Sequence, residues 1–253
     1  MHIRVINPNT TVAMTEKIEL SARAVAGPGT RLDAVTPALG PASIESHYDE
    51  ALSVPGILTE VAAGERAGVE GYVIACFGDP GLDAARELAS GPVVGIAEAA
   101  MHAAMLLGRG FSVVTTLDRT RGRAWELAAR YGAGRACRGV YGCAIPVLEL
   151  ETDPDTVERV IAVGRAALER DDSDVIVLGC AGMADLCARV SAELGVPVVD
   201  GVAAATVFVQ SLVTLGLRTS PRTEYATPPP KNYTGLLAGF TRPDLAGWSA
   251  GPD

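Results

Sequence analysis

Residues 72–100 read YVIACFGDPGLDAARELASGPVVGIAEAA, and residues 174–205 read DVIVLGCAGMADLCARVSAELGVPVVDGVAAA. The two passages share one plan: an apolar strand that ends in a cysteine, small residues, an amphipathic helix, a Val-Val strand after Gly and Pro, and an alanine-rich helix. Self-similarity on this scale indicates an internal repeat, which must be recognised before a fold is assigned. The sequence therefore predicts two similar halves, one built around Cys76 and the other around Cys180.

Short Val/Ile runs alternate with amphipathic segments along the rest of the chain, in the βαβα order that is typical of a parallel sheet flanked by helices. A weaker echo relates residues 3–22 to residues 111–129. The clearest helix is expected at 153–170, where Asp153 is placed to cap it and Pro154 suits its first turn. The predicted strands are 2–7, 31–36, 70–76, 92–95, 110–116, 136–141, 174–179 and 196–200. The predicted helices are 9–25, 53–67, 82–90, 96–107, 120–131, 153–170, 182–194 and 202–216.

The fold class that this order predicts is α/β, with two pseudo-symmetric lobes that each hold a parallel sheet. Lobe one is expected to comprise residues 1–96 plus 206–240, and lobe two residues 97–205. Residues 241–253 are polar enough to form a tail. Residues 37–50 contain few apolar side chains, and they are expected to form either a loop over the cleft between the lobes or an ordinary surface connection.

The composition limits the classes of function. With 253 residues, of which 48% are hydrophobic, the chain can bury a substantial core. Its net charge of -9, from 21 Lys and Arg against 30 Asp and Glu, argues against a nucleic-acid partner, because phosphate binding needs a basic face. No apolar run reaches the roughly 18 residues that span a bilayer. The chain opens on a strand rather than a leader peptide, so a cytoplasmic protein that binds no membrane is expected.

Cysteine and histidine usage argues against disulfides and metals. The chain has five cysteines, an odd number that makes a disulfide framework improbable, so reduced thiols are expected. The histidines His2, His47 and His102 do not lie in metal-ligand spacing, and no metal site is expected. Neither a GxGxxG motif after a strand nor a phosphate-binding loop with Lys is present, so no nucleotide cofactor is expected.

The paired cysteines point to proton-transfer chemistry. Ligands bind at the carboxyl ends of the strands in parallel α/β sheets, so Cys76 and Cys180 would oppose each other if the lobes face across one cleft. A helix N-terminus after each cysteine would lower the thiol pKa from about 8.5 toward neutrality. Inversion of a stereocentre without a cofactor needs one group that removes a proton and another that returns it on the opposite face. Two matched thiols meet that requirement.

The glycine-rich turns after the cysteines are expected to contribute backbone N–H groups. Those near Gly78, Ala181 and Gly182 could stabilise a carbonyl oxygen that gains negative charge. A lone cysteine at a strand end is more often a packing residue, but the equivalent positions of Cys76 and Cys180 favour a functional role. The other thiols have no repeat partner and are assigned structural roles: Cys137, Cys143 and Cys187.

Five motifs carry a family resemblance: INPNT at 6–10, GPASIESHYDE at 40–50, ACFGDPGL at 75–82, LGCAGMA at 178–184 and PPPKNYTG at 228–235. With them the chain resembles the aspartate/glutamate/hydantoin racemase superfamily, and within it the hydantoin racemases, from the first strand to about residue 240. The resemblance implies two Rossmann-like lobes, a small-molecule substrate between them, no cofactor and a homo-oligomer. It also implies that each cysteine serves one enantiomer as base and the other as acid.

Departures from related families narrow the substrate. The chain has Asn7-Pro8-Asn9 where glutamate racemases have an Asp-Ser-Gly turn, and Phe77-Gly78 where they have Asn-Thr, so charged amino acids are poor candidates. Asn7 suits the imide of a hydantoin ring, with a turn or a helix cap as the alternative role. Phe77 and Tyr48 could wall an apolar substituent or simply pack in the core. The substrate-binding prediction is completed by two hydroxyl side chains of the second lobe, Thr115 and Thr116.

The function expected from the sequence is cofactor-independent racemisation at the C5 carbon of 5-substituted hydantoins. Allantoin racemase is the nearest alternative, because a ureido group at C5 cannot be told from an alkyl or aryl group by sequence. Decarboxylases and isomerases of small dicarboxylates share the superfamily, but they would need a cationic or hydroxyl-rich pocket that the motifs do not reveal. A two-lobed binding protein without catalysis is the alternative from another class.

Overall fold

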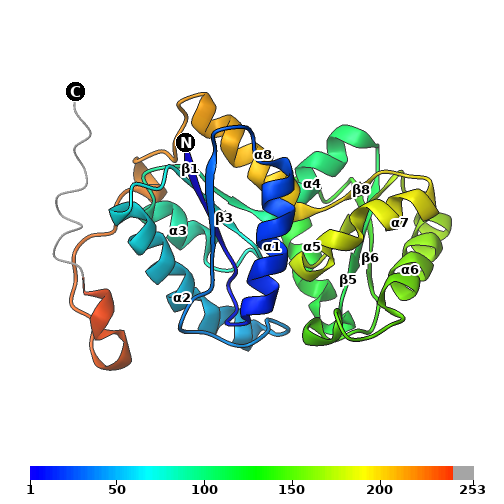
Figure 1. Ribbon diagram of the computed structural model, residues 1–253, viewed down its shortest axis with the longest axis horizontal. Coiled ribbons are helices and arrows are strands. Elements are labelled where there is room, and N and C mark those ends of the chain that lie inside the picture. The colour runs from blue at the N-terminus through cyan, green and yellow to red at the C-terminus, as the bar shows by residue number, and fades with distance from the viewer. Residues whose placement is uncertain (242–253) are drawn as a thin grey trace.

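The computed structural model describes residues 1–241, within which eight strands and eight α-helices alternate (Figure 1). The first half contains β1 (His2–Ile6), α1 (Val12–Val25), β2 (Arg31–Val35), α2 (His47–Arg66), β3 (Gly71–Ile74), α3 (Leu82–Leu88), β4 (Val93–Gly95) and α4 (Ile96–Leu107). The second half contains β5 (Phe111–Thr115), α5 (Arg121–Arg130), β6 (Cys137–Gly142), α6 (Thr156–Asp171), β7 (Val175–Leu178), α7 (Cys187–Leu194), β8 (Val198–Val199) and α8 (Gly201–Thr214). Each predicted strand and helix therefore has a counterpart. The predicted tail lies outside the described residues, apart from residue 241.

The two sheets have the same topology. One has the strand order β2-β1-β3-β4 and the other β6-β5-β7-β8, and the strand pairs in both are parallel. Since β5 takes the place of β1 and β7 the place of β3, the structure repeats the plan that the sequence repeats. The α/β fold class with two similar lobes is confirmed.

Both faces of each sheet are buried, as parallel sheets require. Successive residues of β1 point to opposite faces of the sheet. Ile3 therefore packs with α1 and α8, whereas Ile6 packs with α2 and α3. In the second sheet, Val177 of β7 packs with α4 and α5, and Ile176 packs with α6 and α7. The apolar runs that predicted the strands therefore form four layers of hydrophobic core.

Helices α4 and α8 are exchanged between the lobes. α4 follows the last strand of the first sheet, yet Ala100 and Met101 pack into the core of the second sheet. α8 follows the last strand of the second sheet, yet Val202 and Val209 pack against the first. The predicted change of lobe at residue 97 falls at the start of α4, whereas the predicted return at residue 206 falls inside α8, which packs on the first sheet from its first turn.

Helix starts differ from the sequence prediction at four places. α1 begins at Val12 rather than 9, after a bend at residues 8–10. α2 begins six residues earlier than expected, because the Ser46 side chain caps it by accepting from the Asp49 N–H at 3.1 Å. α6 begins at Thr156 rather than 153, since Asp153 forms a turn that precedes the helix and accepts from the Asp155 N–H. Residues Ala181–Leu186 form a 3-10 helix before α7.

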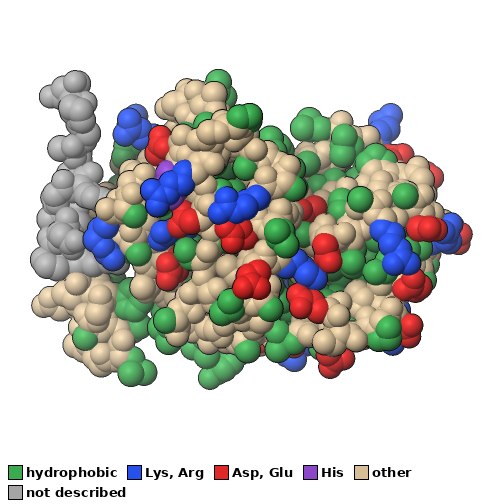
Figure 2. Space-filling model, in the orientation of Figure 1, with side chains coloured by type: hydrophobic (Ala, Val, Ile, Leu, Met, Phe, Trp, Pro, Cys, Tyr) green, Lys and Arg blue, Asp and Glu red, His purple; other side chains and the backbone are tan. Residues whose placement is uncertain are grey.

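Basic and acidic side chains are interspersed over the face of the molecule that Figure 2 shows. Within residues 1–241, no helix combines the length and apolarity needed to cross a bilayer. In the same part of the chain, no cluster of three or more His, Cys, Asp or Glu residues is arranged to hold a metal ion.

Candidate active site

A cavity of about 190 Å³ lies between the lobes, where residues that follow β1, β3, β5 and β7 meet. This is the carboxyl edge of both sheets, where parallel α/β folds bind their ligands. Its volume suits a small ring better than a drug-sized molecule. The lining residues are Asn9, Met14, Ile44, Glu45, Ser46, His47, Glu50, Ala75, Cys76, Phe77, Gly78, Thr115, Thr116, Arg119, Thr120, Arg123, Ala124, Val147, Gly179, Cys180 and Ala181.

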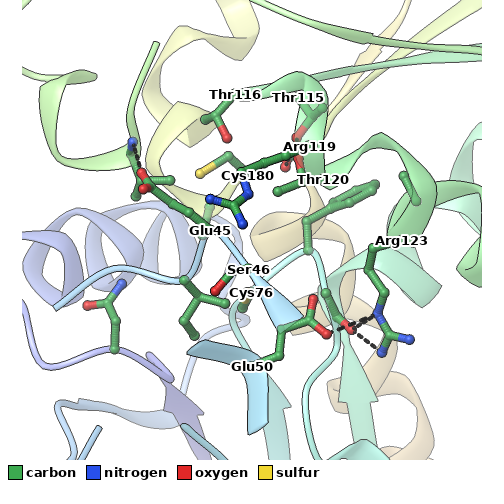
Figure 3. A pocket seen from close by; sticks show the side chains of 18 of the residues that line it. Glu45, Ser46, Glu50, Cys76, Thr115, Thr116, Arg119, Thr120, Arg123 and Cys180 are labelled. Atoms are coloured by element: carbon green, nitrogen blue, oxygen red, sulfur yellow. Dashed lines mark hydrogen bonds and ion pairs between the residues drawn. The ribbon is translucent and has the colours of Figure 1, made fainter. Parts of the chain in front are cut away.

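The structure brings Cys76 and Cys180 to the same cavity, one from each lobe (Figure 3). Each follows one of the two inner strands of its sheet, Cys76 after β3 and Cys180 after β7. Both are partly exposed. After burial, charge on Cys180 is a smaller cause that also raises the pKa of Cys76. The structure therefore places one thiol from each lobe on the same cavity.

The protonation of these thiols departs from the sequence prediction. Burial raises the pKa of Cys180 to about 11 and raises the pKa of Cys76 further. Backbone N–H groups oppose the effect, that of Gly78 at Cys76 and that of Gly182 at Cys180. The predicted lowering by helix N-termini is wrong, because α3 begins only at Leu82 and desolvation outweighs the short 3-10 helix after Cys180.

The turn that carries Cys76 is fastened by an arginine of the opposite lobe. Arg123 of α5 donates through Nε and Nη2 to the carbonyl oxygen of Gly78, at 3.1 and 2.7 Å. Its Nε also lies 3.4 Å from Oε2 of Glu50 on α2 (Figure 3). A Cβ atom at Gly78 would come within 2.5 Å of the Glu50 carboxylate, so a larger residue there would displace that side chain.

The segment 37–50 reaches from lobe one to the cavity and to lobe two. Glu45 Oε1 accepts from the Val147 N–H at 2.7 Å, and Ile44 and Ser46 line the cavity beside it. On its own side, the segment is held by the Thr10 N–H, which donates to the Pro41 carbonyl at 2.9 Å. Of the two roles that the sequence left open, the structure favours a segment over the cleft, with its last residues forming the first turn of α2.

Five of the predicted substrate-binding residues line the cavity: Phe77, Gly78, Thr115, Thr116 and Ala181. The Thr115 hydroxyl donates to the carbonyl of Gly179 at 3.2 Å, next to Cys180 in the chain. Gly182 lies behind its cysteine rather than on the cavity, and its N–H is directed at the Cys180 sulfur. The amides of Gly78 and Gly182 lie near the thiols of Cys76 and Cys180, respectively, and their predicted role toward a substrate oxygen stays a prediction.

Asn7 and Tyr48 lie away from the cavity, which corrects their predicted placement. Asn7 is 0% exposed, and its Nδ2 donates to Asn9 Oδ1 and Thr15 Oγ1, both at 2.9 Å. Its side chain therefore organises the turn after β1, while Asn9 lines the cavity in its place. Tyr48 is 73% exposed, because it occupies the outer side of the first turn of α2.

Several charged residues of the cavity were missed by sequence reasoning. Arg119 and Arg123 follow β5, and Glu45 and Glu50 flank the start of α2. With Ser46 and the threonines at 115, 116 and 120, they make the cavity rich in charged and hydroxyl groups, with two arginines balanced by two glutamates. The expectation of a pocket that is not rich in hydroxyl groups is therefore wrong, whereas its charged residues give no excess of positive charge. Glu45 and Glu50 belong to the motif quoted for residues 40–50. Recognition of a helix cap at Ser46 in the sequence would have predicted that both residues lie at the cavity.

Two α/β lobes with a small polar cavity at their strand ends, and one thiol from each lobe on it, define a two-lobed α/β enzyme. The family model described as Asp/Glu/Hydantoin racemase matches residues 3–209. The chain belongs to this family, and it is a racemase.

Individual relatives agree with this assignment. A hydantoin racemase from Pseudomonas sp. (strain NS671) is 46% identical over 96% of this chain and 98% of its own length. A hydantoin racemase from Rhizobium meliloti is 48% identical over 93% of this chain and 98% of its own length. The structure of allantoin racemase from Klebsiella pneumoniae shares 50% identity and superposes with a TM-score of 0.92, covering 95% of this chain and 99% of that one.

Proposed function

We propose that this racemase inverts the C5 stereocentre of 5-substituted hydantoins without a cofactor, with Cys76 and Cys180 as its two bases. The observation that carries the proposal is that equivalent cysteines of two repeats line one small cavity. The two hydantoin racemases described above support the substrate class, because each aligns over nearly its whole length.

The reaction needs only one proton removed and one returned. The C5 hydrogen of a hydantoin lies beside a ring carbonyl, so its removal leaves an enolate. The thiolate of one cysteine takes the C5 proton and becomes a thiol. The thiol of the other cysteine then delivers its proton to the opposite face of C5 and becomes a thiolate. The enantiomer leaves an enzyme whose two thiols have exchanged protonation states, ready for the reverse reaction.

Allantoin is the second candidate substrate, because the similar structure from Klebsiella pneumoniae is that of an allantoin racemase. Allantoin is a hydantoin with a ureido group at C5, and this group needs both donors and acceptors. The cavity offers the Arg119 guanidinium as donor and the Glu45 and Glu50 carboxylates as acceptors. Met14, Phe77 and the other apolar lining residues would suit an alkyl or aryl substituent instead.

A panel of single-enantiomer substrates tests the substrate class. Optical rotation is followed for 5-alkyl and 5-aryl hydantoins, allantoin, aspartate and glutamate at equal concentrations. We expect loss of rotation with at least one hydantoin and none with the two amino acids, since these lack the ring. Racemisation of aspartate or glutamate alone would overturn the proposal, and a preference for allantoin over the other hydantoins would select the ureido substrate.

We also propose that the enzyme is a cytoplasmic homo-oligomer. The five cysteines are free, which suits a reducing compartment. Large apolar side chains are exposed at Leu106, Leu107 and Leu215, and such groups commonly lie in subunit interfaces. Light scattering after size-exclusion chromatography is expected to give a mass that is a multiple of 26.1 kDa, and a mass equal to that of one chain would contradict the proposal.

A further inference from the structure

Asp79 lies three residues after Cys76 and is 3% exposed. Its backbone has a φ of 45°, in the left-handed region that non-glycine residues seldom adopt. Its N–H donates to the carbonyl of Cys76 at 2.9 Å, so its backbone closes the turn that carries the cysteine. A buried carboxylate on an unusual backbone is retained only where the surrounding structure holds it in place.

Three donors hold the Asp79 carboxylate. The Ala97 N–H donates to Oδ1 at 3.1 Å, and the Glu98 N–H donates to Oδ2 at 2.9 Å. The Tyr131 hydroxyl donates to Oδ2 at 2.8 Å. Burial raises the pKa of Asp79 to about 6, so at neutral pH it is the carboxylate that these donors require.

The partners of Asp79 belong to the side of the molecule that carries Cys180. Ala97 lies in the first turn of α4, whose apolar residues pack into the core of the second sheet. Tyr131 is the C-cap of α5, which covers that sheet. A Cβ atom at Gly95 would lie 2.3 Å from the Asp79 carboxyl carbon, so glycine at this position makes room for the contact. The Asp79 side chain therefore ties the Cys76 turn to the opposite lobe.

In the second half of the repeat, the exchanged helix is capped by an aspartate at a different position. α8 corresponds to α4, and it is capped by Asp200, which accepts from the N–H groups of Val202 and Ala203 at 2.9 and 3.1 Å. Asp200 occupies the position equivalent to Gly95. The position equivalent to Asp79 is Met183, a buried apolar residue. Each half thus has one aspartate that caps its exchanged helix, but only in the first half does that aspartate lie in the cysteine turn.

We propose that Asp79 is a positioning residue that fixes the Cys76 turn against the second lobe, so that the Cys76 thiol stays opposite Cys180 across the bound substrate. This inference rests on the proposed two-cysteine function. Tyr131 and the first turn of α4 hold the carboxylate, and the hydrogen bond between Asp79 and Cys76 passes that restraint to the thiol. Loss of the carboxylate impairs proton transfer by Cys76 and leaves proton transfer by Cys180 intact.

The test measures each cysteine separately. Asp79→Asn is introduced into Cys180→Ala, where Cys76 alone can exchange the C5 hydrogen, and into Cys76→Ala, where Cys180 alone can do so. Exchange of the C5 hydrogen for deuterium is followed by NMR in D₂O at saturating substrate. A hydrogen bond to a charged group contributes a free energy that corresponds to a factor of about 10 to 100 in a rate constant. We therefore expect the rate of exchange by Cys76 to fall about 10- to 100-fold. Exchange by Cys180 is expected to change by less than about twofold.

Asp200→Asn is the matched control, because it weakens the equivalent helix cap without touching a cysteine turn. It is expected to leave the ratio of the two exchange rates unchanged. Tyr131→Phe, which removes a single donor to Asp79, is expected to give a smaller effect on Cys76 in the same direction. Equal losses at both thiols, or no loss at either, would overturn the positioning role.

A second readout separates this inference from the proposed function. Iodoacetamide labelling of the Asp79→Asn variant with both cysteines present is resolved by peptide mass spectrometry. A released turn exposes Cys76, so its labelling is expected to accelerate at least about tenfold relative to Cys180. An unchanged ratio would refute the role of Asp79 even if both cysteines prove catalytic. Racemisation by either single-alanine variant would refute the two-cysteine function, and the labelling ratio would still decide the role of Asp79.

Discussion

Replacement of Cys76 or Cys180 with alanine is expected to abolish measurable racemisation, a loss of at least about 10²- to 10⁴-fold in kcat, the range that one acid–base group contributes. Inversion needs a proton-transferring group on each face of C5. One thiol from each lobe lines the cavity and can serve as such a group. The two variants are not expected to be inert, since the remaining thiol can still remove the proton on its own face. In D₂O each should exchange the C5 hydrogen of one enantiomer with retention, and the two variants should prefer opposite enantiomers.

Cys187→Ala is the control for these variants. Its thiol lies 3.1 Å from the carbonyl oxygen of Val198, away from the cavity, so racemisation is expected within about twofold of the unmodified enzyme. Circular dichroism of all three variants checks that folding is retained. Racemisation that survives at full rate in Cys76→Ala or in Cys180→Ala would contradict the two-base mechanism.

The fold could be predicted because its determinants are local and repeated. The strands 71–74 and 175–178 are apolar runs bounded by turn residues, and the repeat assigned them equivalent places. Parallel pairing then follows from the helices between them. The sequence predicted that α4 joins the second lobe, but it did not predict that α8 packs on the first sheet from its first turn. Both helices present apolar residues, and apolar character does not specify which sheet a helix packs against.

The start of α2 shows how a missed local signal displaces a site. The sequence Ser46-His47-Tyr48-Asp49 matches a capping pattern, in which the Ser46 and Asp49 side chains hydrogen-bond each other at 2.7 Å. A helix that starts at His47 brings Glu50 to the cavity and turns Tyr48 to solvent. Aromatic character alone suggested Tyr48, and helix geometry overruled it.

Other features of the site depend on contacts between distant segments. Arg123 reaches Gly78 across the lobes, and Asp79 reaches Ala97 and Tyr131; no spacing in the sequence encodes these pairs. The thiol pKa is a similar case. The helix N-termini expected after Cys76 and Cys180 suggested stabilised thiolates, but burial of the two thiols in the folded protein dominates.

Racemisation is expected to accelerate with pH, by about tenfold per unit from pH 7 toward pH 10. The raised pKa of Cys180, about 11, means that only a small fraction is thiolate at neutral pH, and that fraction grows tenfold with each unit until the pH approaches the pKa. The pKa of Cys76 is raised further, so Cys76 stays protonated over the same range and remains able to donate. The proton-removing thiolate is thus supplied by Cys180 first. Because the equilibrium constant between two enantiomers is 1, kcat/KM is the same in both directions, and it should follow the ionisation of Cys180.

The measurement is kcat/KM for racemisation between pH 6 and 10.5, with iodoacetamide labelling of Cys180 in Cys76→Ala as an independent titration of the thiol. Because the folded thiols hold their protons more tightly than unfolded ones, folding stability falls as the pH rises past about 8.5, the pKa of an unfolded cysteine. Circular dichroism at each pH must therefore show a folded enzyme. The prediction is contradicted if the rate is flat above pH 7 while labelling of Cys180 still increases. The thiolate would then form in the substrate-bound site independently of the bulk pH. Closure of the lobes, rather than the environment of the free thiol, would set the active protonation state.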